Sequence, residues 1–198
     1  MEKPTLIFDV DGVLIQWESQ LPFFCAKNGI DPTNVLKHFT CPVHSTPNKL
    51  LGIRDHKMAS DMLQRYNIEH GKYMTAFTDA VESIHKLARD YNLIALTKFG
   101  NTTEHWTIRK FNLETFFPRC FKELITIEYT ESKVPYVHEI MGRENVVGFI
   151  DDQLENINEI RDNCGVETVF LNRFDDHADL KSVGEIKAYL NRCKAIHP

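Results

Sequence analysis

The sequence predicts an α/β fold, in which helices flank a parallel sheet and a small α-helical cap is inserted after the first strand. Three observations lead to this prediction. Short apolar runs recur along the chain, and segments with helical periodicity separate them. One stretch of about 60 residues after the first run has helical patterns but no convincing strand.

Four short apolar runs are the predicted strands of the sheet. They cover residues 6–8, 93–96, 146–150 and 166–171, and residues 124–127 form a weaker fifth. The runs are continuous rather than alternating, which is typical of strands that are buried on both faces. Because helical segments lie between them, we expect a Rossmann-like arrangement with right-handed crossovers and helices on both faces of the sheet.

The first helices between these strands are indicated by apolar periodicity and by capping residues. One helix carries apolar residues from Val81 to Ala88 at helical spacing, and Thr78 or Asp79 is its expected cap. The next helix is expected to open at Asn101, because Glu104 follows at the offset of a capping pair.

Two further helices are predicted in the C-terminal part of the chain. Apolar residues at helical spacing between 154 and 160 mark the first, and Gly165 closes it. Ser182 and Glu185 have the spacing of a capping box, which predicts a last helix over the apolar residues from 186 to 190.

The stretch from residue 16 to residue 75 is the predicted cap. It contains three helical segments, at residues 22–28, residues 32–39 behind an Asp31 cap, and residues 54–66, with a loop at Pro42 and Pro47 between the second and the third. We therefore predict a Rossmann-like core formed by residues 1–15 and 76–198, and a helical cap formed by residues 16–75.

Composition excludes several classes of protein. The chain has 198 residues, of which 42% are hydrophobic, so it can bury a sizeable core. Its net charge is −5 and its Lys and Arg residues are not clustered, which argues against a nucleic-acid partner. No apolar run reaches the roughly 18 residues of a membrane span. Five scattered cysteines without a C-x-x-C pair indicate reduced thiols. We expect a cytoplasmic protein that is a monomer or a weak homodimer.

Polar residues follow three of the predicted strands. They are Asp9 and Asp11 after the first strand, Thr97 and Lys98 after residues 93–96, and Asp151 and Asp152 after residues 146–150. Ligands of open α/β sheets bind at the carboxyl ends of the strands, so these side chains are expected on one face. Four crowded carboxylates repel one another unless a cation holds them, and oxygen ligands suit a hard ion such as magnesium.

Four motifs of the chain together resemble those of the haloacid dehalogenase superfamily. They are the run Phe-Asp-Val-Asp-Gly-Val-Leu at residues 8–14, Thr97 after a strand, Lys133 before a helix, and the pair Asp151-Asp152. The motifs occur in the order of the family and cover nearly the whole chain. The resemblance implies a capped, phosphatase-type member that requires magnesium.

The resemblance also implies roles for the residues after the first strand. Asp9 would attack phosphorus and form an aspartyl-phosphate, and it would also bind the metal ion. Asp11 would donate a proton to the leaving oxygen and later take one from water, while its backbone carbonyl would be a second magnesium ligand. Gly12 would let the chain turn tightly away from the site, and it is also expected among the residues that bind the phosphate or the substrate.

The other motifs would complete the site. Thr97 would donate a hydrogen bond to a phosphoryl oxygen, and Lys133 would offset negative charge on the nucleophile and the phosphoryl group. Asp152 aligns with the acid that binds the metal directly. Asp151 aligns with an auxiliary ligand that acts directly or through water.

Two positions depart from the pattern of the family. Lys133 is followed by Val134 and not directly by proline, so Lys98 and Lys122 are alternatives for the catalytic cation. Lys98 itself stands where the family often has asparagine. It is either a solvated surface lysine or an additional cation that binds the phosphate or the anionic substrate.

The function that these observations favour is magnesium-dependent hydrolysis of a small phosphorylated metabolite, with the cap closing over the site. A phosphomutase or a nucleotidase of the same superfamily is an alternative. A dehalogenase is disfavoured, because it needs no second acid and Asp11 is present. A phosphate-binding signalling receiver is also an alternative, but its acids follow the strands in a different order and it has no helical insertion. A catalytically silent relative is disfavoured by the intact acids.

Overall fold

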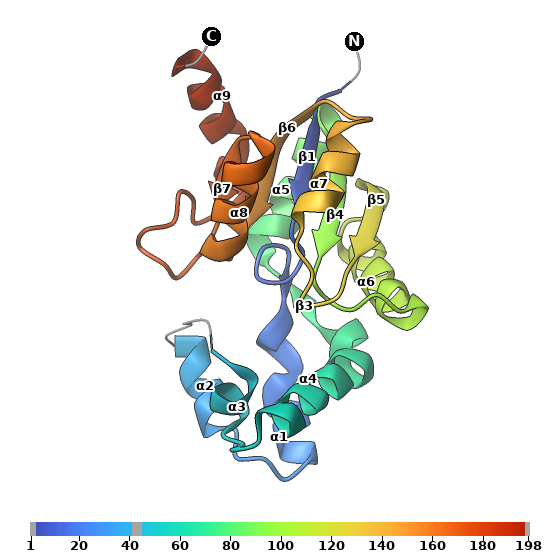
Figure 1. Ribbon diagram of the computed structural model, residues 1–198, viewed down its shortest axis with the longest axis vertical. Coiled ribbons are helices and arrows are strands. Elements are labelled where there is room, and N and C mark those ends of the chain that lie inside the picture. The colour runs from blue at the N-terminus through green and yellow to red at the C-terminus, as the bar shows by residue number, and fades with distance from the viewer. Residues whose placement is uncertain (1–2, 41–44, 197–198) are drawn as a thin grey trace.

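The computed structural model describes residues 3–40 and 45–196 and contains a five-stranded parallel sheet (Figure 1). The strand order is β5-β4-β1-β6-β7. The strands are β1 (Thr5–Phe8), β4 (Asn92–Thr97), β5 (Phe121–Thr126), β6 (Val146–Asp151) and β7 (Thr168–Phe170). Helices flank this sheet, so the predicted α/β, Rossmann-like fold class is confirmed.

The bounds of the three inner strands agree with the prediction to within one residue at each end, whereas the two edge strands differ more. β5 begins at Phe121 rather than at residue 124, and its side chains are mostly half-buried, so the apolar run is weak there. β7 is shorter than the predicted run, because Val166 is buried in the core but lies outside the ladder.

Side chains of the inner strands alternate between two hydrophobic clusters, one on each face of the sheet. In β1, Leu6 and Phe8 belong to the larger cluster and Ile7 to the other. The larger cluster is covered by α5 (Thr78–Asp90), α6 (Thr103–Phe116) and α9 (Ile186–Ile196), with η3 (Val183–Glu185) before α9. The second is covered by α7 (Val134–Met141) and α8 (Leu154–Cys164). The central strand is therefore rigidly held from both sides.

Several helix ends differ in detail from the prediction. The N-cap of α5 is Phe77 and no side chain caps it; the carboxylate of Asp79 accepts hydrogen bonds from Arg173 instead. Thr102, not Asn101, caps α6, because its hydroxyl accepts a hydrogen bond from the backbone N–H of His105. Gly165 closes α8 with a left-handed φ of 63°, as predicted.

The predicted capping box at Ser182 forms only in part. The Ser182 hydroxyl accepts a hydrogen bond from the N–H of Gly184 and so caps η3. Glu185 reaches the N–H of Lys181 rather than that of Ser182. The short 3-10 turn before α9 shifts the second partner by one residue.

The described residues from 17 to 40 and from 45 to 73 form the helical part of the chain between β1 and α5. The elements are η1 (Trp17–Gln20), α1 (Leu21–Lys27), α2 (Thr33–Thr40), α3 (Pro47–Leu51), α4 (His56–His70) and η2 (Gly71–Tyr73). Figure 1 shows α1 to α4 grouped beyond the carboxyl end of the sheet. The prediction missed α3: Pro47 indicated a loop, but it occupies the first turn of the helix, where its missing N–H costs nothing. Pro42 lies outside the described residues.

A two-stranded antiparallel ribbon joins this helical part to the sheet. It consists of β2 (Ile15–Gln16) and β3 (Thr75–Ala76), with Ile15 opposite Ala76 and Gln16 opposite Thr75. The prediction of no strand in residues 16–75 was wrong at these two ends, because strands of two residues carry no periodicity. Both predicted boundaries of the cap lie within the ribbon, and the division into core and cap stays a prediction.

Two further observations concern the chain as a whole. None of the helices in the described ranges has both the length and the apolar character needed to cross a bilayer. Cys25, Cys120, Cys164 and Cys193 are free thiols, and Cys41 lies outside the described residues.

Candidate active site

The three inner strands bring the predicted site residues to one edge of the sheet. β1 pairs with β4 on one side and with β6 on the other, and all three strands are parallel. Asp9 follows β1 directly, and its N–H donates to the carbonyl of Ile150, next to Asp151. Thr97 is the last residue of β4 and Asp151 is the last of β6. Residues separated by more than 50 positions in the chain thus become neighbours.

Lys133 lies at the centre of this cluster. Its ammonium nitrogen is 2.7 Å from Oδ1 of Asp9 and 2.8 Å from Oδ2 of Asp151. The side chain is almost fully buried, with 1% of its surface exposed. The alternative cations are engaged elsewhere: Lys122 pairs with Glu144, and Lys98 donates to Asn156. The geometry therefore favours Lys133 among the three lysines that the sequence left open.

Asp9, Asp151 and Asp152 form a group that could hold a metal ion. One carboxylate oxygen of each lies within 4.8 Å of the others. Asp151 is the most engaged, because Lys133, the side chain of Asn156 and the N–H of Gln153 all donate to it. Oδ1 of Asp152 is buried and accepts no hydrogen bond. Asp152 therefore offers an unpaired ligand atom, and its direct role in metal binding stays a prediction.

Gly12 lies against the carboxylate of Asp152. A Cβ atom at this position would be 2.0 Å from Oδ2 of Asp152, and the φ of Gly12 is +80°, which non-glycine residues rarely adopt. Glycine is required here for two reasons, conformation and space. The predicted contact of Gly12 with a phosphoryl group stays a prediction.

Burial shifts the pKa values of the central groups. It raises the pKa of Asp9 to about 7, although Lys133 acts in the opposite direction. Burial also raises the pKa of Asp152 well above its ordinary value, and the negative charges of Asp9 and Asp151 add to the effect. Burial would lower the pKa of Lys133, but Asp151 and Asp9 outweigh it, so this pKa is raised and the lysine stays charged.

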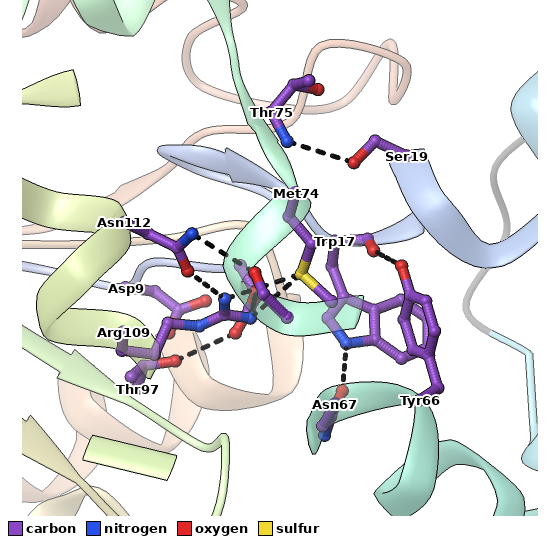
Figure 2. Close-up of polar contacts among 12 residues, drawn as sticks. Asp9, Trp17, Ser19, Tyr66, Asn67, Met74, Thr75, Thr97, Arg109 and Asn112 are labelled. Atoms are coloured by element: carbon purple, nitrogen blue, oxygen red, sulfur yellow. Dashed lines mark hydrogen bonds and ion pairs between the residues drawn. The ribbon is translucent and has the colours of Figure 1, made fainter. Parts of the chain in front are cut away.

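Asp11 has different partners from Asp9. Its Oδ2 accepts a hydrogen bond of 3.2 Å from the Thr97 hydroxyl, and its Oδ1 forms an ion pair with Nη2 of Arg109. Figure 2 draws Thr97 and Arg109, the two partners of this carboxylate, with their polar contacts. Burial raises the pKa of Asp11, while Arg109 and the Thr97 hydroxyl act to lower it. The structure thus brings Asp11 and Thr97 together, but it adds a cation that the motifs did not include.

Two residues of the site were missed by the sequence analysis. Arg109 lies on the buried side of α6, next to the buried residues Ile108 and Asn112. An arginine among inward-facing positions of a helix is an unusual signal, and it could have been noticed. Asn156 on α8 donates to Asp151 and accepts from Lys98 at 2.9 Å, so Lys98 reaches Asp151 only through this amide. Its predicted contact with phosphate or substrate stays a prediction.

Comparison with known proteins defines the fold. No model of a known protein family matches the sequence. An uncharacterized 32.4 kDa protein of Enterobacteria phage T4, from the Gp30-rIII intergenic region, is 32% identical over 151 residues, which are 76% of this chain and 54% of that protein. The chain therefore spans about half the length of this curated relative.

Solved structures resemble the chain over almost its whole length. A haloacid dehalogenase-like family hydrolase from Streptococcus pneumoniae has a TM-score of 0.66 at 16% identity, and covers 94% of this chain and 98% of its own. YfnB from Bacillus subtilis is described as a HAD-hydrolase and is bound to magnesium. It has a TM-score of 0.65 at 16% identity, and the match covers 96% of this chain and 100% of YfnB. CbbY from Rhodobacter sphaeroides, in complex with phosphate, has a TM-score of 0.58 at 14% identity, and the match covers 96% of this chain and 100% of CbbY. The chain has the fold of haloacid dehalogenase-like hydrolases.

Proposed function

We propose that the protein is a magnesium-dependent phosphomonoester hydrolase in which Asp9 is the nucleophile. One observation carries the proposal: the carboxylate of Asp9 follows the central strand, lies 2.7 Å from the ammonium of Lys133, and has an oxygen within 4.8 Å of an oxygen of Asp152. A nucleophile held between a fixed cation and a metal-binding acid is suited to attack a phosphoryl group, whose negative charge must be offset.

The donor set fits magnesium. Asp9, Asp11, Asp151 and Asp152 carry four negative charges when ionised, and the cations in direct contact with them among the described residues are Lys133 and Arg109. Two charges stay unbalanced, and the buried Oδ1 of Asp152 has no partner. Asp9, Asp152, Asp151 and the backbone carbonyl of Asp11 would hold the ion, which would supply positive charge against the phosphoryl oxygens. The magnesium in YfnB supports this assignment.

The residues of the chain would divide the reaction into two displacements. In the first, a carboxylate oxygen of Asp9 forms a bond to phosphorus, the bond from phosphorus to the leaving oxygen breaks, and Asp11 gives that oxygen a proton. In the second, water attacks phosphorus, Asp11 takes a proton from it, and the bond to Asp9 breaks to release phosphate. Lys133 would bind phosphoryl oxygens in both steps, and Thr97 would do so when a phosphoryl oxygen replaces Asp11 as the acceptor of its hydroxyl proton.

A phosphomutase uses the same chemistry and differs in returning the phosphoryl group to the substrate. Hydrolysis is the simpler proposal, because water can accept the group without a second substrate site. The presence of Asp11 favours phosphoryl transfer over dehalogenation, since a dehalogenase has no leaving oxygen to protonate. Residues 16–75 would close over the site as a cap and exclude bulk water.

The proposal is tested by hydrolysis of p-nitrophenyl phosphate with and without magnesium, in the wild type and in Asp9→Asn. We expect turnover that requires magnesium and that the variant lacks, because an amide cannot act as the nucleophile. Equal turnover by the two proteins would contradict the mechanism. A panel of small phosphorylated metabolites would then identify the substrate, and recovery of an isomeric phosphate in place of free phosphate would indicate a mutase.

A further inference from the structure

We propose that Arg109 is a positioning residue, which orients the carboxylate of Asp11 and links this orientation to the segment that returns from the cap to the core. We call residues 71–76 the return segment; they comprise η2, Met74 and β3. The inference rests on the proposed function, because it assumes that Asp11 transfers protons. It adds a way in which the cap could control that transfer.

Arg109 is held rigidly inside the protein. None of its side-chain surface is exposed, and its guanidinium carbon lies 3.5 Å from the centre of the Phe99 ring. Burying a guanidinium is costly unless it is paired, so its contacts decide where it lies. The planar fork of arginine can hold several partners at fixed angles, unlike the ammonium of lysine.

One side of the guanidinium faces Asp11. Nη2 of Arg109 pairs with Oδ1 of Asp11, while the Thr97 hydroxyl donates to Oδ2 of the same carboxylate. Because both oxygens are held by groups from different elements, rotation of the carboxylate breaks at least one contact. The orientation of Asp11 is therefore set by Thr97 on β4 and by Arg109 on α6.

The other side of the guanidinium faces Met74 of the return segment and Asn112 of α6, as Figure 2 shows. Both Nη atoms lie 3.5 Å from the sulfur of Met74. Nη1 also donates to Oδ1 of Asn112 at 2.8 Å, and the Asn112 amide donates to the carbonyl of Gly71 at 3.2 Å. The return segment is thus attached to Arg109 by two direct contacts with the Met74 sulfur and by one contact through Asn112.

The return segment lies close against α6. A Cβ atom on Gly71 would be 2.7 Å from a methyl carbon of Ile108, so the backbone passes where a side chain would not fit. Displacement of this segment would remove Met74 and the Gly71 carbonyl from the contacts of Arg109 and Asn112. Since the same guanidinium holds Asp11, the position of the segment and the orientation of the acid are physically linked.

The test uses two substrates of similar shape with different leaving groups, p-nitrophenyl phosphate and phenyl phosphate. A poor leaving group needs protonation by Asp11 more than a good one does. In Arg109→Lys, we expect kcat/KM for phenyl phosphate to fall about tenfold more than kcat/KM for p-nitrophenyl phosphate. Equal losses on both substrates would overturn the role, because a purely structural defect lowers the amount of active protein for both alike.

A double-mutant cycle with Asp11→Asn tests whether Arg109 acts through Asp11. Replacing Arg109 in the Asp11→Asn background should cause little further loss of kcat/KM, whereas independent effects would multiply. Multiplicative losses would overturn the proposal. Arg143→Lys is the matched control, because Arg143 pairs with Glu123 outside the site and should leave the ratio of the two substrates unchanged.

The link to the return segment has its own variant. Asn112→Leu keeps the branched shape of the side chain and removes both the hydrogen bond from Nη1 of Arg109 and the hydrogen bond to the Gly71 carbonyl. We expect the same preference between substrates, at about threefold rather than tenfold. If the ratio of kcat/KM for the two substrates is unchanged, the proposed link to the return segment is wrong, whereas the role of Arg109 in orienting Asp11 is not contradicted. A failure of the proposed function would be recognised by a different result, namely no turnover by the wild type or equal turnover by the wild type and Asp9→Asn. The ratio is read on folded protein, so partial unfolding does not imitate the effect.

Discussion

Two buried cations contact the carboxylates of the site, and they differ in what else they contact. Lys133 is shared by Asp9 and Asp151, at 2.7 Å and 2.8 Å, so both of its ion pairs are to acids of the proposed metal site. Arg109 pairs with Asp11 and in addition contacts Asn112 and Met74. The comparison indicates that the compact ammonium of Lys133 neutralises the charge of two carboxylates. The planar guanidinium of Arg109 instead fixes the orientation of one carboxylate relative to neighbouring elements.

The largest effect is expected from replacing Lys133. It distinguishes the two cations by how the loss of kcat/KM depends on the leaving group of the substrate. Lys133→Met should lower kcat/KM about a thousandfold and equally for good and poor leaving groups, because the lost charge acts on the phosphoryl group itself. The measurement is steady-state hydrolysis of the two aryl phosphates named above. Lys122→Met is the control, since Lys122 pairs with Glu144 away from the site. If Lys133→Met instead lost more activity on phenyl phosphate than on p-nitrophenyl phosphate, Lys133 and Arg109 would have the same effect on the leaving group, and the distinction between them would be wrong.

Asp11→Asn should have the next largest effect, a loss of about a hundredfold in turnover. Asp9, the proposed nucleophile, is intact in this variant, so the protein should still become phosphorylated, whereas attack by water lacks its base. Quenched samples analysed by intact mass should contain a phosphorylated protein. Rapid release of phosphate by the variant would show that Asp11 does not take the proton, and Arg109 would then have no reaction to influence.

Asp152→Asn tests the side of the site that Lys133 does not reach. Titration calorimetry should find magnesium bound about tenfold or more weakly, because the amide replaces the free carboxylate. In chelator the same variant should be more stable than the wild type at neutral pH, since burial disfavours the charged form of Asp152 and raises its pKa. Unchanged magnesium affinity would contradict the assignment of Asp152 as a ligand.

The smallest expected effect is the pH dependence of stability without metal. Burial raises the pKa of Asp9 from 3.8 to about 7, so the folded protein keeps a proton that the unfolded chain releases. The stability from this group is present below the unfolded pKa and is lost as pH rises through about 7. From about pH 5.5 to about pH 7.5 the loss should be about 2 kcal/mol, measured by urea unfolding in chelator. Asp9→Asn should lack this component, and an equal slope in both proteins would contradict the shift.

The sequence was sufficient for the parts of the molecule that are encoded locally. Short apolar runs followed by acids predicted the inner strands and the convergence of Asp9 and Asp151, because parallel strands end at one edge. Lys133 followed from its place in the series of motifs. The ends of the edge strands were less accurate, since half-exposed strands lose the continuous apolar signal.

What was missed depends on contacts between distant residues. Arg109 could have been noticed as an arginine among inward-facing positions of its helix, but its pairing with Asp11, 98 positions away, appears only when α6 packs against the sheet. The contacts of Asn156 with Asp151 and Lys98 give no signal in the sequence either, because asparagine is common at the starts and on the surfaces of helices. The ribbon of β2 and β3 is too short for any periodicity, and α3 was hidden by a proline that fits a first helical turn.

The pairing of Gln16 with Thr75 has a consequence for engineering and for how such chains diversify. The two strands leave and re-enter the sheet side by side in antiparallel orientation, which is the arrangement that a two-residue turn can close. Everything between them could be exchanged for such a turn, or for another insertion, without rerouting the remaining chain. Substrate selection could then change by transplantation while Asp9, Asp151 and Asp152 stay where they are. Asp11 is the exception, because Arg109, which holds it, would lose its contacts with Met74 and, through Asn112, with Gly71.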